Sequence, residues 1–298
     1  MSFFGHDARM DHPQTAAVTF SAHNIRLADG SFTKPGGIPT DSNPTFRSAQ
    51  RILDLVFPGS KRGLRIADLG CLEGGYTVAF ARLGFDALGV DVRESNIRSC
   101  RYVESRVGLP NLSFVQDDVW NIARHGPFDA IFCCGLLYHL DRPRAFIDLL
   151  ASVTRRVVIL ETHFSEARDA PSPIQPRRLR RALARVLPLP HTATTTHKLS
   201  RLAENEGLKG RWFREFLTQS QFEDRENRKW ASWDNRRSFW PQREYLLEAI
   251  QRAGFDTVLE QFDQLGPDIA ESMTRGFYRA HGRGTFVGIK SLERASSS

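Results

Sequence analysis

Residues 64–75 read LRIADLGCLEGG, a short apolar run that leads into an acidic residue and then into a glycine-rich turn. The stretch that follows, GGYTVAFARLG at residues 74–84, has the pattern of a helix. Glycine at such a turn lets the backbone approach a ligand closely and start a helix sharply. The sequence therefore predicts a strand, a ligand-binding turn and a helix, a unit that many α/β proteins share.

Strand-like and helical stretches continue to alternate along the chain, which predicts a parallel sheet with both faces covered. The predicted strands are residues 64–70, 86–92, 112–119, 128–140, 155–164, 256–263 and 284–292. The predicted helices between them are residues 74–84, 94–108, 143–153 and 242–255. We therefore expect an α/β fold, a Rossmann-like seven-stranded, mostly parallel sheet with helices on both faces.

An irregular arm is predicted for residues 1–44, because this region is rich in Gly, Pro, Ser, Asp and His and has little periodicity. Within it, residues 23–37 read as a short strand, an Asp-Gly turn and a Pro-Gly break. Residues 45–163 follow as the core, and a helix should begin at Pro44, capped by Ser42 or Asn43.

Residues 164–240 break the alternation and predict an inserted cap or lid that recognises the substrate. They contain the basic amphipathic stretch 176–190, which either packs on its own domain or a second subunit or binds an anionic or acyl ligand. Residues 241–298 return to the core with a helix, the last two strands and a tail that we expect to be disordered.

The composition of the 298-residue chain, 41% apolar and 25% charged, excludes collagen-like, coiled-coil and wholly disordered classes. It has no run of about 18 apolar residues and no apolar stretch typical of a signal peptide near its start, so we expect a cytoplasmic protein without membrane insertion. Four cysteines without a Cys-x-x-Cys pair predict reduced, mostly buried thiols. The net charge of +7 suits an anionic partner, although 35 of the 41 basic residues are arginine, a skew that often reflects a GC-rich genome.

Acidic residues close three consecutive predicted strands. Asp91 ends the second strand about 20 residues after the glycine-rich turn, the position of a carboxylate that holds a ribose diol. Asp117 and Asp118 end the third strand, where an acid can accept a hydrogen bond from an adenine amine. These acids fit adenosine, whereas a pyrophosphate would sit badly beside Asp68 and Glu73. An NAD-binding Rossmann domain is the alternative, and the crowding of carboxylates opposes it.

This pattern resembles the class I S-adenosylmethionine-dependent methyltransferases over residues 45–163, with return elements within 241–290. The acid-rich first motif of that family corresponds to Asp68, Gly70 and Gly74, and its middle glycine is replaced by Leu72. The resemblance implies an antiparallel strand at the sheet edge. It also implies that Asp91 binds the ribose, Asp118 and the Val119 N–H the adenine, and Gly70, Glu73 and Tyr76 the methionine part. The expected cofactor-binding residues are Asp68, Gly70, Glu73, Gly74, Tyr76, Asp91, Asp117, Asp118, Val119 and Cys134.

Methyl transfer to a hydroxyl needs a base, and His139, after the fourth strand, is suited to that task because histidine titrates near neutrality. The alternative is that His139 caps a helix or packs structurally. Glu161 and His163 end the fifth strand on one side, so they are expected to act as a base with its partner, as metal ligands or as substrate hydrogen-bonders. Some related sugar methyltransferases use Mg²⁺, which is a possible cofactor here by that resemblance, but no closely spaced set of acids stands out, so the sequence assigns no metal ligands.

The segment 230–240 carries three of the five tryptophans, and aromatic faces stack on sugar rings or nucleobases. The expected substrate-binding residues are Tyr138, Trp230, Trp233, Asp234, Asn235, Arg236 and Trp240. The alternative is a small satellite core under the cap. The resemblance to these methyltransferases implies by analogy that the arm folds over the active site, so that Asn24, Arg26 or Thr33 contacts ligand. The alternative is a surface arm that packs on the sheet edge.

The arm, residues 135–143 and residues 157–164 are also similar to the methyltransferase branch that contains the tRNA wobble-uridine-modifying enzymes and methyltransferases of sugars and natural products. We expect an O-methyltransferase for a hydroxylated small molecule, first of all a sugar, glycoside or polysaccharide precursor, as in a methylated-mannose type of pathway. An RNA-modifying methyltransferase is the first alternative, and a non-catalytic binding protein on the same fold is the second. We expect a homodimer.

Overall fold

The computed structural model describes residues 18–166, 199–275, 278 and 282–291. The amphipathic stretch 176–190 and the tail 293–298, for which the sequence makes specific predictions, lie outside the described residues.

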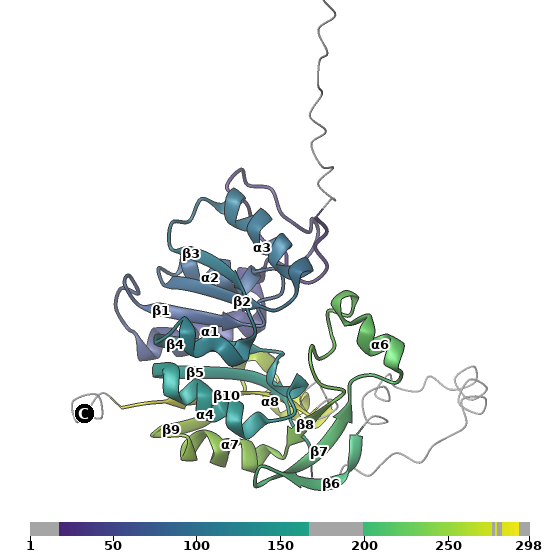
Figure 1. The fold of residues 1–298 in the computed structure, drawn as a ribbon. Helices are drawn as coiled ribbons and strands as arrows, with labels where there is room; N and C mark the ends of the chain where they lie inside the picture. Colours follow the sequence, from purple (N-terminus) through teal and green to yellow (C-terminus); the bar gives the residue numbers. More distant parts are fainter. Residues whose placement is uncertain (1–17, 167–198, 276–277, 279–281, 292–298) are drawn as a thin grey trace, which may run out of the picture.

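A seven-stranded sheet forms the centre of the protein, as the sequence predicts (Figure 1). Its strands lie in the order β3-β2-β1-β4-β5-β10-β9, and β1 to β5 pair in parallel. β10 runs antiparallel to both of its neighbours, so the last two strands, β9 and β10, form the antiparallel edge that the resemblance implies. The strands are β1 Arg65–Leu69, β2 Asp86–Asp91, β3 Leu112–Gln116, β4 Phe128–Cys134, β5 Thr154–His163, β9 Thr257–Gln261 and β10 Arg283–Ile289.

Helices cover both faces of this sheet because its inner strands are apolar on both sides. In β4, Ala130 and Phe132 pack toward one face, while Ile131 and Cys133 pack toward the other. The first face is covered by α1 Pro44–Val56, α2 Gly75–Arg82 and α3 Glu94–Val107. The second face is covered by α4 Pro143–Val153 and α7 Arg243–Arg252.

Local sequence signals account for several helix ends. α1 starts at Pro44, whose ring favours the first helical position, and the Asn43 side chain accepts a hydrogen bond from Thr45 N at 2.9 Å. α3 ends at Val107 and is followed by Gly108 in the left-handed region, which glycine adopts without strain. The short helices are η1 Thr40–Ser42, η2 Val119–Arg124, η3 Leu137–His139, α6 Gln219–Glu223, η5 Arg225–Asn227, η6 Asp263–Leu265 and α8 Ile269–Arg275.

The described part of the insertion builds a second, three-stranded antiparallel sheet that the sequence did not predict. Its strands are β6 Leu199–Asn205, β7 Leu208–Arg214 and β8 Arg237–Pro241, drawn in green in Figure 1. The sheet attaches to the core through backbone hydrogen bonds, among them Phe239 N to Leu140 O at 2.9 Å. A Ser165–Gln242 bridge closes the insertion at its base. The insertion therefore sits against the loop that follows β4.

All four cysteines are free thiols, and three of them are buried, in agreement with the sequence. Among the residues that the structure describes, no helix has the length and apolar character that crossing a bilayer demands.

A substitution of Phe80 on α2 tests how much the core on the first face of the sheet contributes to stability. Its side chain is fully buried between the rings of Phe46 and Phe132. We expect Phe80→Ala to lower the free energy of unfolding by about 3–5 kcal/mol, because it leaves a large cavity. Leu55→Ala on α1, where the side chain is 77% exposed, is the control and should change stability by less than about 0.5 kcal/mol. Chemical denaturation measures both, and equal effects would contradict this account of the core.

Candidate functional site

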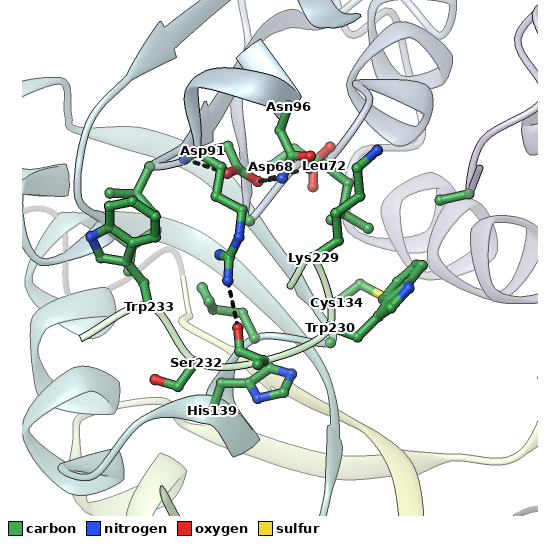
Figure 2. A pocket seen from close by; sticks show the side chains of 18 of the residues that line it. Asp68, Leu72, Asp91, Asn96, Cys134, His139, Lys229, Trp230, Ser232 and Trp233 are labelled. Carbon is green, nitrogen blue, oxygen red and sulfur yellow. Dashed lines mark hydrogen bonds between the residues drawn. The ribbon is translucent and has the colours of Figure 1, made fainter. Parts of the chain in front are cut away.

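A cavity of about 370 Å³ lies at the carboxyl ends of β1 to β4. Figure 2 shows Asp68, Asp91 and Asn96 at one side of it and His139 at the opposite side. Its walls come from four strand ends, from the N-terminal arm and from the insertion. The residues that line it are Ser21, Ala22, His23, Ile38, Thr40, Asn43, Asp68, Gly70, Leu72, Tyr76, Asp91, Val92, Arg93, Asn96, Asp118, Val119, Trp120, Cys134, Gly135, Leu136, Tyr138, His139, Leu140, Lys229, Trp230, Ala231, Ser232, Trp233, Asp234 and Arg283.

The glycine-rich turn after β1 forms the floor of the cavity. Gly70 has a φ of +70°, and a Cβ there would lie 3.4 Å from Leu136. Leu72, which stands where the related family has glycine, also adopts a left-handed φ of +51°. Its N–H donates to Asp91 Oδ2 at 3.0 Å, and this hydrogen bond helps to hold a conformation that a leucine rarely adopts.

Two carboxylates meet at the ends of β1 and β2. Asp68 accepts a hydrogen bond from Thr77 Oγ1 at 2.6 Å, and burial raises its pKa to about 7. Burial also raises the pKa of Asp91, against the hydrogen bonds that it accepts. These come from Arg93 N at 2.9 Å and Asn96 Nδ2 at 3.1 Å, besides Leu72.

Asp117 and Asp118 follow β3, and their side chains have different surroundings. Asp118 lines the cavity, and its Oδ1 accepts a hydrogen bond from Trp120 N at 3.0 Å. Asp117 is absent from the lining and instead bonds to Asn121 Nδ2 and His125 Nε2, at 2.7 and 2.8 Å. Val119 lines the cavity beside Asp118, as the resemblance implies. Asp117 thus stabilises the loop after β3.

Glu73 also does not line the cavity and has a different task, which is to hold the N-terminal arm. Its oxygens accept hydrogen bonds at 2.8–3.0 Å from the backbone N–H groups of Ser21, Ala22 and His23. Lys229 Nζ lies 3.0 Å from Glu73 Oε1. Burial alone would raise the pKa of Glu73, but these donors outweigh it and lower the pKa to about 2.

His23 also attaches the arm to the start of α2. Its Nδ1 accepts a hydrogen bond from Gly75 N at 3.0 Å, and burial lowers its pKa to about 4. A Cβ on Gly75 would lie 2.6 Å from the His23 ring, so this glycine makes room for the arm. Gly74 similarly makes room for Phe114, at 2.6 Å from a Cβ, and does not line the cavity.

The arm reaches the cavity through residues other than those the sequence suggested. Ser21, Ala22, His23, Ile38, Thr40 and Asn43 line it. Asn24 instead bonds to the backbone of Gly37 and Lys34, and Thr33 Oγ1 donates to His23 O at 3.0 Å. Arg26 forms a bridge with Phe32 across the Asp-Gly turn that the sequence predicts.

Residues 228–234 of the insertion, here called the strap, cover the cavity on another side (Figure 2). The Arg93 guanidinium, next to Asp91, donates to Arg228 O at 3.0 Å and to Ala231 O at 2.8 Å. The Trp233 ring lies 5.3 Å from the Arg93 guanidinium carbon and 4.9 Å from that of Arg225. Together with the Lys229–Glu73 ion pair, these contacts hold the strap at two places, one near Asp91 and one at the turn after β1.

His139 lines the cavity from η3, which follows β4. Its Nδ1 lies 2.9 Å from an oxygen of Glu215, a residue that the sequence analysis did not single out. The neighbouring Tyr138 lines the cavity as well, and its ring centroid lies 4.2 Å from that of His139. The structure thus places the predicted base at the cavity with a carboxylate behind it.

Glu161 and His163 lie behind the cavity wall and do not line it. Glu161 forms a two-pronged ion pair with Arg283 and accepts a hydrogen bond from Cys134 Sγ at 3.3 Å. The His163 ring stacks on Trp240 with centroids 4.5 Å apart. Within the described ranges, no cluster of three or more His, Cys, Asp or Glu side chains is arranged to hold a metal ion.

The predicted substrate-binding residues divide into two groups. Tyr138, Trp230, Trp233 and Asp234 line the cavity, and Trp230 is 64% exposed. The others serve the insertion itself. Asn235 bonds to Ser232 Oγ and Arg237 O, Arg236 pairs with Gln219, and Trp240 packs against Phe213 and donates to Tyr138 O.

The donors and acceptors of the cavity fit an adenosyl group. Asp91 and Asp118 supply carboxylate acceptors, and buried Asn96 Oδ1 is a further acceptor without a hydrogen-bond partner among the described residues. Ribose hydroxyls and an adenine amine are donors that match this set. The cationic side chains of the wall, Arg93, Lys229 and Arg283, already bind backbone carbonyls or carboxylates, which disfavours a pyrophosphate.

Several residues of this site carried no sequence signal. Glu215 and Lys229 lie in the insertion, where no motif marks them, and their roles depend on how the chain returns to the core. Arg93 had a signal in its position two residues after the strand-end Asp91, and Asn96 had one in its place within the first turn of α3.

Comparison with known proteins agrees with this geometry. The family model described as "Methyltransferase domain" matches residues 44–260. The ubiquinone biosynthesis O-methyltransferase of Proteus mirabilis is 26% identical over 95 residues, which is 31% of this chain and 38% of that relative. The chain thus spans well under half of that relative's length.

Two solved structures of the N-terminal domain of EvdMO1 have similar folds. The one with SAH bound has a TM-score of 0.55 at 24% identity and covers 84% of this chain and 82% of that one. The one in the presence of SAH and D-fucose has a TM-score of 0.57 at 24% identity and covers 88% of each chain. At this identity the likeness concerns the fold.

Asp91 and Asp117 provide a matched test of the cofactor side. We expect Asp91→Ala to weaken S-adenosylmethionine binding about 10- to 100-fold, because hydrogen bonds to a charged acceptor contribute roughly 1.5–3 kcal/mol. Asp117→Ala should leave the affinity within about threefold, because that side chain faces Asn121 and His125. Calorimetric titration measures both, with thermal melts to check folding. A larger loss in Asp117→Ala would overturn this assignment.

The attachment of the arm through His23 and Glu73 should depend on pH. The pKa of His23 is lowered from 6.5 to about 4 by burial, so its stabilising effect is complete above pH 6.5 and is lost as the pH falls toward 4. The maximum loss is about 3 kcal/mol. Glu73 adds a second loss only between about pH 4.5 and 2. The hydrogen-exchange protection of residues 21–40, measured relative to an unfolded chain at the same pH, should therefore fall between pH 6.5 and 4, and His23→Asn should remove that dependence. An unchanged pH profile in the variant would refute the assignment to His23.

Proposed function

This chain belongs to the methyltransferase-domain family and is an S-adenosylmethionine-dependent methyltransferase, and we propose that it methylates a hydroxyl of a small molecule. A sugar, glycoside or polysaccharide precursor is the acceptor class that we favour. The observation that carries the proposal is His139, which lies in the same cavity as the adenosine-binding acids and is backed by a carboxylate.

The residues of the cavity suit an in-line displacement. S-adenosylmethionine supplies a methyl group on a sulfonium, so the acceptor oxygen forms a bond to that carbon while the carbon–sulfur bond breaks. His139 takes the proton of the acceptor hydroxyl, because an alcohol is too weak a nucleophile in its neutral form. Asp91, Asp118 and the Gly70 turn hold the cofactor, which fixes the direction of attack.

The exposed mouth of the cavity supports a sugar-like acceptor. Trp233 is held between two guanidinium groups, whereas Trp230 presents a largely exposed ring beside the cavity. Such a ring stacks on the apolar face of a sugar, and Asp234, which also lines the cavity, supplies an acceptor for hydroxyl groups. The name of the Proteus mirabilis relative also specifies transfer to oxygen.

A labelled-methyl assay tests this proposal. We would incubate the protein with isotopically labelled S-adenosylmethionine and either total tRNA or a small-molecule and oligosaccharide extract, each with and without a chelator. We expect label in the small-molecule fraction. Label in nuclease-sensitive RNA would replace this proposal with an RNA methyltransferase, to which the net charge of +7 would then contribute. Loss of activity with the chelator would show that a metal takes part.

Two histidines form a matched pair in the same assay. We expect His139→Ala to lower kcat about 10²- to 10⁴-fold with little change in S-adenosylmethionine affinity, because general base catalysis contributes on that scale. His125→Ala should retain kcat within about twofold, since His125 bonds to Asp117 outside the cavity lining. Normal turnover by His139→Ala would rule out this residue as the base.

A further inference from the structure

Glu215 is a buried carboxylate between the end of β7 and the start of α6, and the cofactor site does not use it. Its side chain is 2% exposed. Oε1 accepts a hydrogen bond from Ser238 Oγ at 2.7 Å and lies 2.9 Å from His139 Nδ1, while Oε2 accepts one from Ser232 N at 3.2 Å. A carboxylate removed from water in this way needs several donors, and it has them here.

From this arrangement we infer that Glu215 is a positioning residue that holds His139 with its proton on Nδ1 and leaves Nε2 to receive the proton of the acceptor. The inference rests on the proposed function of His139 as the base. An ionised carboxylate can only accept hydrogen bonds, so it selects the imidazole form that donates from Nδ1. It also stabilises the imidazolium that forms when the base takes a proton.

Glu161, the carboxylate that the sequence suggested as part of the catalytic group, does not compete for this role. Glu161 pairs with Arg283 and accepts a hydrogen bond from Cys134, so its oxygens already have partners behind the cavity wall. Ser238 donates to the oxygen that also faces His139, which fixes the carboxylate from behind. Since Ser238 lies in β8 and Glu215 follows β7, the second sheet is the rigid support of the pair.

The third donor links the pair to the strap. Ser232 N belongs to residues 228–234, which cover the cavity and bind Arg93 beside Asp91. The strap therefore helps to orient Glu215 only when it lies over the cofactor side. Through this bond the insertion both covers the cavity and supports the base.

Glu215→Gln is the central variant, because the amide keeps the shape and can donate to Nδ1, which selects the opposite tautomer. We expect kcat to fall about 10- to 10³-fold while S-adenosylmethionine affinity stays within about twofold. Glu223→Gln, at an exposed carboxylate on α6, is the matched control and should keep both values. In the His139→Ala background, Glu215→Gln should cost less than about twofold more, since the residue acts through His139. A full additive loss there would show a structural role and overturn the inference.

A second measurement separates this inference from the proposed function. It uses the unaltered protein, so the result does not depend on whether a variant folds. Nitrogen-15 shifts of the His139 ring in the unaltered protein report its tautomer directly. In the neutral ring we expect the proton on Nδ1, and the opposite tautomer would overturn the inference. Normal turnover by His139→Ala would instead refute the base assignment, while the ring shifts would still decide whether Glu215 sets the tautomer.

Discussion

The carboxylate of Glu73 is the point at which three separate segments of the chain meet. It lies in the turn after β1, accepts backbone hydrogen bonds from the arm and pairs with Lys229 of the strap. A buried charge of this kind is tolerated only when donors surround it, so each segment depends on the presence of the others. The cavity therefore has walls from three parts of the sequence because one buried charge beside it, in the turn after β1, binds both of the other segments.

The central sheet could be predicted from the sequence almost strand by strand. Apolar runs such as residues 128–134 are buried on both faces, and the turns between them carry glycine, so local signal and tertiary environment agree. The second sheet could not be predicted in this way. Residues 199–205 and 208–214 alternate without a clear apolar face, and the pairing of β7 with β8 depends on contacts between residues more than 20 positions apart.

The site was predictable where the backbone alone decides which residues meet. Asp68, Asp91 and Asp118 end neighbouring parallel strands, so they reach one edge whatever the side chains do. Glu73 and Asp117 lie next to such positions, yet the structure gives them other hydrogen-bond partners. Strand alternation did place Glu161 and His163 on one side, but the alternation does not tell whether that side is open or filled by Arg283 and Trp240.

The way in which Arg93 holds the strap has a consequence for how such a protein can diversify. Its guanidinium bonds to the carbonyl oxygens of residues 228 and 231, which every amino acid carries. The Trp230 side chain can therefore be exchanged during evolution without loss of these backbone bonds or of the Lys229–Glu73 pair. A fixed arginine in the core thus leaves the acceptor-facing surface free to acquire new specificities, while the cofactor half of the cavity stays unchanged.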